Sequence, residues 1–507
     1  MITRRGFLGG LPALPALAQS GKRPNIVLVF SDDHAYQAIS AYDGRLNRTP
    51  HIDRIAREGV RFDNALVTNS ICAPSRAVVL TGKYSHLNGV IDNRQSFNGE
   101  QQTFPKLLRA AGYQTALFGK WHLQSRPTGF DAWEILPGQG SYYNPDFITP
   151  SGNRRRDGYV SGITTGLSLD WLDGRDASRP FLLMCQHKAP HRNWCPAPEK
   201  LSMYEGVTFP EPDNLFDNYE HRASPARNQA MEIDRHMRLG MDLKLTGDAP
   251  DQQGPVNELN RMSDAQRRVW EAAYRRRNAD FHARKLQGRD LVRWKYQRYM
   301  QDYLACVSSV DDSVGRILNW LDAAGEADNT IVVYNSDQGF YLGEHGWYDK
   351  RWIYEESIRS PMVARWPGVI RPGSVAKEMV ANLDLAETFL DAAGLPVPPD
   401  MQGRSLLPVM RGQTPADWRR SFYYQYYEGG EHAVARHCGV RTDRYTLAHF
   451  YETDEWELFD RQKDPRQMRS VYGDAAYAPE VKRLKAELAR LRGELKVPVA
   501  DPDRQKP

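Results

Sequence analysis

Residues 25–30, with the sequence Asn-Ile-Val-Leu-Val-Phe, form a run of apolar side chains with almost no polar interruption. Strands that are buried on both faces have this composition, whereas a half-exposed strand alternates polar and apolar residues. Similar runs at 114–118, 181–185 and 330–334 are separated by helical patterns at 49–59, 103–112 and 303–323. This alternation predicts an α/β fold with a large mixed, mostly parallel sheet flanked by helices on both faces.

The chain has 507 residues, which suggests one large domain and a smaller one. We expect a large α/β domain over residues 19–379 and a C-terminal subdomain over residues 380–507, where the pattern of predicted elements changes. Short aromatic strands, typical of an antiparallel sheet, are predicted at residues 422–427, 434–440, 445–449 and 456–459. One face of a closing helix is marked by Leu484, Leu488, Leu491 and Leu495.

Residues 210–300 interrupt the α/β pattern, because they are polar, rich in arginine and poor in strand-forming residues. Ser263 and Asp264 can cap a long helix that continues through Trp270 and Arg277. A solvated helical insertion is the interpretation we favour, and a site for polyanions such as an acidic glycan is the alternative. The formal net charge of the whole chain is only +4, so the charge does not indicate nucleic-acid binding.

The first residues resemble an export signal rather than a folded element. Residues 3–8, Thr-Arg-Arg-Gly-Phe-Leu, resemble a twin-arginine motif, and a short apolar stretch with a small-residue cleavage site follows. That stretch is too short to span a bilayer, and no later segment looks transmembrane. We therefore expect residues 1–18 to direct twin-arginine export, and the mature protein to be periplasmic or secreted.

Two of the predicted strands end in carboxylates. Asp32 and Asp33 follow the strand at 25–30, and Asp337 and Gln338 follow the strand at 330–334. In open α/β sheets, ligands bind at the carboxyl ends of the strands, so these side chains could converge on one cation. Three carboxylates and an amide oxygen favour Ca²⁺, or less readily Mg²⁺, over zinc. A loop cap is the alternative for each Asp taken alone.

Cys72 stands at the start of a short apolar helix, in the sequence Cys-Ala-Pro-Ser-Arg. Pro74 suits a first helical turn, and Gly82 can end the helix. The free N–H groups at a helix start favour anions, although a lone cysteine there is more often a small buried hydrophobe. Of the other four cysteines, Cys185 and Cys195 could form a disulfide, and buried free thiols are the alternative.

Cations and proton donors follow the remaining strand ends. Lys120 and His122 come after the strand at 114–118, and His187 and His191 come after the strand at 181–185. Lys350 lies in a loop beyond the last of the four strands. A single Lys or His in a loop is usually solvated, but these groups all follow strands of one predicted sheet. We expect them to surround Cys72.

Taken together, these motifs resemble the type I sulfatases of the alkaline-phosphatase superfamily over nearly the whole mature chain. The stretches that carry the resemblance are residues 72–76, 81–84 and 119–122 and, near the C-terminus, residues 457–460 and 464–465. In that family the cysteine is oxidised to formylglycine, whose hydrate attacks a sulfate ester. The resemblance implies that residues 19–379 are the catalytic domain, and that a formylglycine-generating or radical sulfatase-maturing enzyme acts on Cys72.

The resemblance also implies a role for each candidate residue. The modified Cys72 would bind calcium together with Asp32, Asp33, Asp337 and Gln338. Arg76 would orient the hydrated aldehyde, and the sulfate oxygens would be held by Lys120 and Lys350. His122 and His191 would contact the sulfate and the bridging oxygen. Relatives often have His-x-Pro where this chain has His191-Arg192-Asn193, so the choice of His187 or His191 as general acid stays open.

Residues 92–97, 188–194 and 336–340 resemble sulfatases that act on sulfated glycans, in particular N-acetylglucosamine-6-sulfatase-like members, and this resemblance implies a sulfated glycan as substrate. Sugar contacts are expected from Asn93, Arg94, Arg192 and Trp194, and from His432 or His437 at the rim; alternatively, these residues only pack the subdomains together. His187 is also expected to bind the substrate. A phosphonate monoester hydrolase or phosphodiesterase of the same superfamily is the first rival hypothesis. A non-catalytic protein that binds sulfated glycans is the second.

Overall fold

The computed structural model describes residues 22–499, so the predicted export signal lies outside the described residues. A ten-stranded sheet forms the centre of the molecule, in the order β13-β2-β12-β9-β1-β8-β4-β5-β6-β7. Its strands are β1 (Asn25–Ser31), β2 (Val60–Phe62), β4 (Gln114–Lys120), β5 (Ala132–Leu136), β6 (Asp146–Thr149), β7 (Gly152–Arg155), β8 (Phe181–Gln186), β9 (Thr330–Ser336), β12 (Met362–Arg365) and β13 (Ser374–Ala376).

The centre of this sheet is parallel, as predicted. β1 pairs in parallel with β8 and β9, and β4 pairs in parallel with β8 and β5. Antiparallel pairs lie toward the edges, where β12 joins β9 to β2, and β6 joins β5 to β7. All seven residues of β1 are buried, because helices cover both faces of the strand. The predicted large mixed sheet flanked by helices is confirmed.

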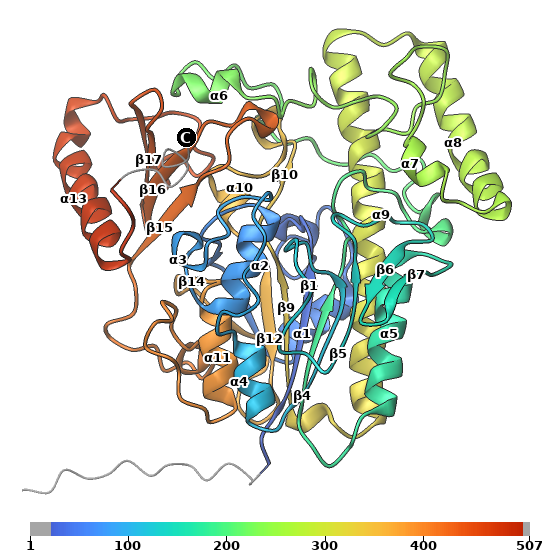
Figure 1. Cartoon of the computed structure of the whole chain (residues 1–507). Helices are drawn as coiled ribbons and strands as arrows, with labels where there is room; N and C mark the ends of the chain where they lie inside the picture. Colours follow the sequence, from blue (N-terminus) through green and yellow to red (C-terminus); the bar gives the residue numbers. More distant parts are fainter. Residues whose placement is uncertain (1–21, 500–507) are drawn as a thin grey trace, which may run out of the picture.

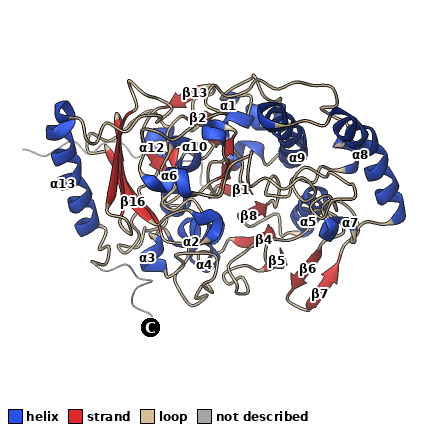
Figure 2. Cartoon of the chain, turned by 90° about the horizontal axis from the view of Figure 1, so that it is seen from above, coloured by secondary structure: helices blue, strands red, loops and turns tan. Residues whose placement is uncertain are grey.

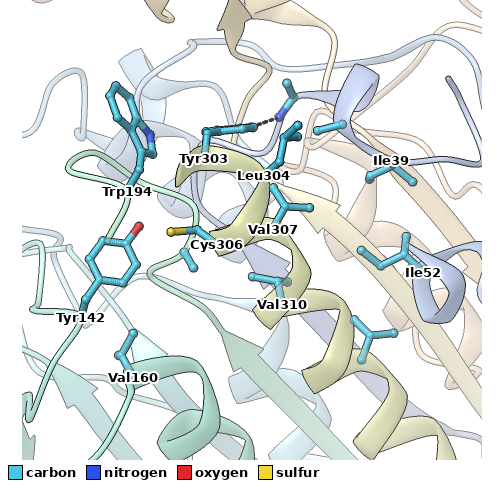
Figure 3. Close-up of a cluster of buried hydrophobic side chains, with 14 of the residues drawn as sticks. Ile39, Ile52, Tyr142, Val160, Trp194, Tyr303, Leu304, Cys306, Val307 and Val310 are labelled. Atoms are coloured by element: carbon cyan, nitrogen blue, oxygen red, sulfur yellow. Dashed lines mark hydrogen bonds between the residues drawn. The ribbon is translucent and has the colours of Figure 1, made fainter. Parts of the chain in front are cut away.

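Alternate residues of the central strands enter two separate cores. Val27 and Val29 face a core built with α1 (Pro50–Arg57), α5 (Val160–Gly174) and α9 (Gly288–Ala323). Figure 3 shows part of this core, in which α9 lies between Tyr142 on one side and Ile39 and Ile52 on the other. Ile26 and Leu28 face the other core, built with α2 (Cys72–Thr81), α4 (Phe104–Ala110) and α11 (Asp384–Ala392). The period of two along each strand produces this division.

Helix α9 is longer than the predicted 303–323, because it begins at Gly288. Its first half is rich in charged residues, but Val292, Tyr296 and Tyr299 recur at helical spacing and are buried. Before it lies α8 (Asp264–Arg284), which is capped by Ser263 as predicted. The Ser263 hydroxyl accepts a hydrogen bond from the backbone amide of Gln266, and the Gln266 side chain accepts one from the backbone amide of Ser263. The helical insertion at 210–300 thus consists of loops and of α6 (Ser224–Asn228), α7 (Val256–Leu259), α8 and the start of α9.

A separate antiparallel sheet follows near the C-terminus, in the order β15-β16-β17-β18. Its strands are β15 (Ser421–Tyr426), β16 (His437–Thr442), β17 (Tyr445–Phe450) and β18 (Glu455–Asp460). Helix α13 (Ala478–Glu494) packs on it through Leu484, Leu488 and Leu491, as the leucine spacing predicts. This unit lies on one side of the main sheet, and α8 lies on the other (Figure 1, Figure 2).

The segment after residue 379 begins within the main body rather than in the C-terminal sheet. β14 (Val380–Ala381) pairs with β3 (Ala65–Leu66), and α11 buries Leu385 and Phe389 in the core that it shares with α2 and α4. The short remaining elements are α3 (Ser85–Asn88), α10 (Glu355–Ile358), α12 (Leu407–Met410), β10 (Tyr341–Leu342) and β11 (Tyr348–Asp349). A cut at 379 would separate α11 from its core, and the proposed division into 19–379 and 380–507 stays a prediction.

Two further expectations concern the cysteines and the membrane. All five cysteines are buried free thiols, so Cys185 and Cys195 are not paired. Within residues 22–499, every helix is too short or too polar to cross a bilayer.

Candidate functional site

The carboxyl ends of four neighbouring strands meet at one edge of the main sheet, and most of the predicted site residues follow these ends. Asp32 and Asp33 follow β1, Asp337 and Gln338 follow β9, and Lys120 is the last residue of β4. The end of β8 leads into the loop that carries two of the predicted histidines. Because these strands are parallel and adjacent, side chains far apart in the sequence come together here.

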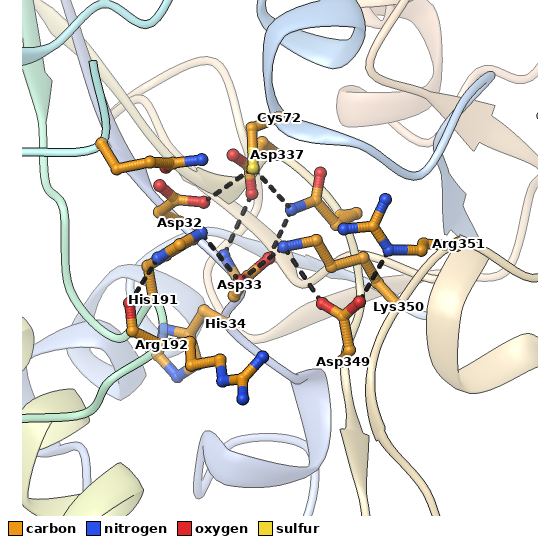
Figure 4. Close-up of polar contacts among 12 residues, drawn as sticks. Asp32, Asp33, His34, Cys72, His191, Arg192, Asp337, Asp349, Lys350 and Arg351 are labelled. Atoms are coloured by element: carbon orange, nitrogen blue, oxygen red, sulfur yellow. Dashed lines mark hydrogen bonds and ion pairs between the residues drawn. The ribbon is translucent and has the colours of Figure 1, made fainter. Parts of the chain in front are cut away.

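Three fully buried carboxylates form the centre of the site (Figure 4). One oxygen from each of Asp32, Asp33 and Asp337 lies within 4.8 Å of the other two. Each carboxylate has a cationic partner: Lys120 contacts Asp32, Lys350 Nζ lies 2.8 Å from Asp33 Oδ2, and Arg76 Nη2 lies 3.0 Å from Asp337 Oδ2. Burial raises the pKa of Asp33 to about 6, even though Lys350 opposes the shift. The cluster therefore concentrates negative charge that a bound cation would stabilise.

Gln338 adds an amide to this cluster. Its Nε2 donates a hydrogen bond to Asp33 Oδ1 at 2.5 Å, while its buried Oε1 has no hydrogen-bond partner. The nitrogen and oxygen of such an amide exchange places by a half turn, which would direct Oε1 toward the carboxylates. Four oxygen donors at this spacing are the ligand set of a hard divalent cation such as Ca²⁺ or Mg²⁺. The donor set therefore fits the predicted metal.

Cys72 is the first residue of α2, and its Sγ lies 3.4 Å from Asp32 Oδ1 and 3.8 Å from Gln338 Nε2. Burial raises the pKa of the thiol to about 12. At neutral pH an unmodified Cys72 is therefore a protonated thiol and a poor nucleophile. The start of a helix favours an anionic substrate at this position, whereas the protonated thiol is itself unsuited to attack such a substrate.

Two residues of the same helix hold the cluster in place. Arg76 Nη1 donates to the Lys120 carbonyl at 2.9 Å and to Gln186 Oε1 at 2.8 Å, in addition to its contact with Asp337. Ser75, which the sequence analysis did not single out beyond the motif, donates its hydroxyl hydrogen to the Asp337 carbonyl at 2.5 Å. α2 thus ties the ends of β4, β8 and β9 to Cys72.

The histidines differ in where they point. His191 Nε2 lies 3.8 Å from Asp33 Oδ2, while its Nδ1 is 2.6 Å from the Arg192 carbonyl. Burial lowers the pKa of His191 well below its usual value, and it lowers the pKa of His122 to about 2. His187 is fully buried with its Nε2 3.6 Å from Cys185 Sγ, on the core side of the sheet. Of the two candidates left open, only His191 faces the carboxylates.

A cavity of about 670 Å³ adjoins this cluster through His191 and Lys350, which line the cavity and contact Asp33. The predicted site residues in its wall are Asn93, His191, Arg192, Lys350 and His432. Further residues of the wall, which the sequence analysis did not single out for a role, are Gln139, Lys188, Glu258, Asp349, Arg351 and Glu428. The cavity is large enough for a sugar that carries a sulfate group.

A buried ion-pair network forms one wall of the cavity. Arg351 Nε lies 2.7 Å from Asp349 Oδ2, and its Nη1 lies 2.6 Å from Glu428 Oε2. His432 Nε2 is 3.4 Å from the same oxygen of Asp349. Asp349 and Arg351 have φ angles of 79° and 93°, which non-glycine residues rarely adopt and which cluster at functional sites. The one sequence signal that could have pointed to Asp349 and Arg351 is that they flank Lys350, a predicted site residue. Their strained backbone could not be predicted from the sequence.

The structure corrects several expected sugar contacts. His437 lies inside the C-terminal core, where its Nε2 accepts a hydrogen bond from the Ile353 amide, so His432 and not His437 reaches the cavity. Trp194 is fully buried in the main core, because it packs against Tyr299. Asn93, another expected sugar contact, reaches the cavity and accepts a hydrogen bond from the Ala73 amide at the start of α2. Its neighbour Arg94 is paired with Asp92 and is not part of the cavity wall.

Comparison with known proteins agrees with this geometry. The family model described as "Sulfatase" matches residues 24–395, and "N-sulphoglucosamine sulphohydrolase, C-terminal" matches residues 343–494. The chain is 50% identical to an N-acetylglucosamine-6-O-sulfatase of Bacteroides thetaiotaomicron, over 91% of this chain and 85% of the relative. It is 29% identical to the human N-acetylglucosamine-6-sulfatase, over 85% of this chain and 72% of that protein.

A solved structure gives the same result at the level of the fold. The structure of BT4656 in complex with its substrate D-glucosamine-2-N,6-O-disulfate superimposes with a TM-score of 0.92 and 48% sequence identity, over 96% of this chain and 100% of that chain. The match covers both the main sheet and the C-terminal sheet. On this evidence the chain is an enzyme that belongs to the sulfatase family, within the alkaline-phosphatase superfamily.

Proposed function

We propose that this enzyme removes the 6-O-sulfate from an N-substituted glucosamine, as the names of its two N-acetylglucosamine-6-sulfatase relatives say of them. The observation that carries the proposal is the placement of Cys72 against three buried carboxylates, next to a sugar-sized cavity whose wall residues His191 and Lys350 contact Asp33. Lysines and arginines around that point suit a sulfate ester, which carries negative charge throughout the reaction.

Two groups that the chain itself does not encode complete the proposed site. Asp32, Asp33, Asp337 and Gln338, together with the modified Cys72, would hold a Ca²⁺ ion, which when bound supplies positive charge that offsets the charge of the sulfate. Formylglycine made from Cys72 would supply, in its hydrated form, one hydroxyl for attack on sulfur and a second whose deprotonation releases sulfate. The protonated thiol of an unmodified Cys72 supports the need for this change.

The cationic side chains would bind and orient the sulfate group. Lys120 and Lys350 contact Asp32 and Asp33 in the free protein, and a divalent cation at these carboxylates would leave both ammonium groups free for sulfate oxygens. Arg76, held by two neutral acceptors and by Asp337, would keep residue 72 in position for in-line attack. Holding the reacting groups in this orientation lowers the entropic cost of bringing them together for the reaction.

His191 would give a proton to the departing sugar oxygen. Its Nδ1 is fixed by the Arg192 carbonyl, so its Nε2 points toward the carboxylates and the cavity. Burial keeps His191 neutral in the free protein, and the negative charge of a bound sulfate ester would raise its pKa. His122, which is buried beside Lys120, would contact the sulfate rather than the sugar.

The wall formed by Asp349, Arg351, Glu428 and His432 would recognise the sugar. Carboxylate and guanidinium groups held in fixed positions discriminate between hydroxyl configurations, because an unmatched partner stays buried and unpaired. These groups line the same cavity as Gln139 and Glu258, from which they are far apart in the sequence. We assign them to the glucosamine ring and its hydroxyl groups.

Maturation and export complete the proposal. Cys72 is 1% exposed, so a maturing enzyme would have to reach it before α2 packs into the core. The twin-arginine signal predicted at residues 1–18 would then export an already folded and modified enzyme to the periplasm or beyond. Fractionation of the producing cells, combined with peptide mass spectrometry of residue 72 from each fraction, tests both steps. A periplasmic enzyme with wholly unmodified Cys72 would refute the formylglycine mechanism.

The substrate is tested by direct comparison of sulfate and phosphate esters. N-acetylglucosamine-6-sulfate, the same sugar sulfated at position 3 or 4, an aryl sulfate and an aryl phosphonate monoester should be supplied to the purified enzyme. We expect the 6-sulfate to be hydrolysed with the largest kcat/KM. Preference for the phosphonate would instead indicate a phosphonate monoester hydrolase, and binding without turnover of any ester would indicate a glycan-binding protein.

A further inference from the structure

Positive charge is concentrated in one part of this chain. Between Asp264 and Arg298 there are nine arginines and two lysines but only four carboxylates, a formal charge of +7. The whole chain carries +4, so the remainder sums to −3. The segment corresponds to α8 and the first part of α9, at the outer edge of the molecule (Figure 2). Charge of this density on one surface attracts polyanions.

The charge borders a groove rather than a flat surface. The groove has a volume of about 660 Å³ and lies between α8, α9 and residues 205–208. Arg298 forms part of its base and is only 3% exposed. Its guanidinium donates to the Leu243 carbonyl and to Asn278 Oδ1, both uncharged, and lies over the ring of Tyr274. Burial lowers the pKa of Arg298, and the nearby charge of Asp302 opposes this shift, so Arg298 adds positive charge to the base of the groove.

Three more arginines lie along the rim of the groove. The side chains of Arg276, Arg284 and Arg293 are 88%, 52% and 45% exposed. Each pairs with a carboxylate at 3.3–3.6 Å, and Arg293 Nε donates a long hydrogen bond to Glu211. A guanidinium has five N–H donors, so donors remain for an incoming anion, and their planar geometry suits the oxygens of a sulfate group.

We propose that the groove between α8 and α9 is a second binding site for a sulfated glycan chain, in which Arg276, Arg284 and Arg293 bind sulfate groups that are not being hydrolysed. The groove shares no residue with the catalytic cavity, so it acts by holding a polymer near the enzyme. This inference rests on the proposed function, because a sulfatase of glycans meets its substrate as part of a chain. Other polyanions are alternatives that the experiment separates.

The test uses the full-length enzyme and a triple variant with Arg276→Gln, Arg284→Gln and Arg293→Gln. The probe is heparin as a polysulfated chain, with duplex DNA and anionic phosphatidylserine vesicles as comparison polyanions. We expect the dissociation constant for heparin at 0.15 M NaCl to rise about 10-fold or more, and the slope of log K against log salt to fall by up to about 3. Hydrolysis of N-acetylglucosamine-6-sulfate should match that of the wild type.

The matched control is a triple variant with Lys482→Gln, Arg483→Gln and Arg490→Gln on α13, which removes the same charge from another exposed helix. Equal heparin affinity in the groove variant and the wild type, or an equal loss in the control, would overturn the proposal. The proposal would also be overturned if the wild type bound DNA or vesicles as tightly as heparin and the groove variant lost that binding to the same extent. If the wild type fails to hydrolyse the monosaccharide sulfate, the proposed function fails, whatever the heparin result.

Discussion

Arg351 offers the sharpest test of how the cavity wall is held together. The residue is 5% exposed and binds two carboxylates, with Nε 2.7 Å from Asp349 and Nη1 2.6 Å from Glu428. An Arg351→Met substitution preserves most of the aliphatic volume but removes the charge. It leaves two buried carboxylates, of which only Asp349 keeps a cationic neighbour, Lys350 at 3.3 Å. The expected result is a large loss of stability together with weaker substrate binding.

The magnitude follows from burial. Removing one partner of a buried ion pair costs about 3–5 kcal/mol, because the other charge stays desolvated. Since Lys350 compensates Asp349 in part, we expect about 3 kcal/mol for Arg351→Met at pH 7. Burial alone would raise the pKa of Asp349, but Arg351 and Lys350 outweigh it and hold this pKa well below its usual range. The stability that the pair contributes is therefore present above about pH 4, the pKa of an unfolded Asp, and is lost as the pH falls toward the folded value.

Urea denaturation of the wild type and the variant at pH 7 and at pH 3.5 measures both statements. The difference in unfolding free energy should be large at pH 7 and smaller at pH 3.5. Arg483→Met is the matched control, because Arg483 forms an exposed pair with Glu480 on α13 and should cost less than about 1 kcal/mol. A loss below about 1 kcal/mol for Arg351→Met at pH 7, or one equal to the control, would refute the reasoning.

Three further predictions concern the nucleophile, the metal and a buried carboxyl group. Cys72→Ala and Asp32→Asn should each reduce kcat by at least about 10³-fold with an unchanged circular dichroism spectrum, and near-normal turnover by either variant would contradict its assignment. Chelation by EGTA should abolish activity and lower the melting temperature, with Ca²⁺ at a 1,000-fold excess over Kd restoring about 4 kcal/mol; a melting curve indifferent to EGTA and Ca²⁺ would count against the site. Burial raises the pKa of Glu457 to about 7, so its contribution to stability is present below pH 4.5 and lost as the pH rises through 7. Urea midpoints should therefore fall between pH 5 and 8 more steeply for the wild type than for Glu457→Gln, and parallel profiles would show that Glu457 titrates normally.

The four central strands of the main sheet, β1, β4, β8 and β9, were predictable because each is buried on both faces. β1, β8 and β9 consist almost wholly of apolar residues, and that composition has few explanations other than a central strand. The first half of α9 was not predicted, because arginines and lysines mask the recurring Val292, Tyr296 and Tyr299 that pack into the core. Periodicity is a weak signal when long charged side chains cover the exposed face.

The same contrast holds for the candidate site. Asp32, Asp33 and Asp337 could be named in advance, since they directly follow strands whose carboxyl ends share one edge of the sheet. Neither His187 nor His432 could be assigned in that way. His187 follows the same strand as His191 but turns toward Cys185, while His432 reaches Asp349 across more than 80 residues of sequence.

The sequence by itself determined the family and the carboxylate cluster beside Cys72, because short motifs at strand ends and at one helix start encode them locally. Only the tertiary structure decided which histidine faces the carboxylates, which residues line the cavity, and that the arginine-rich insertion borders a groove. The physical reason is that these features depend on packing between distant segments: the C-terminal sheet carries Glu428 toward Arg351, and α8 and α9 bring their arginines together. Local sequence patterns carry no information on such contacts until both partners are folded.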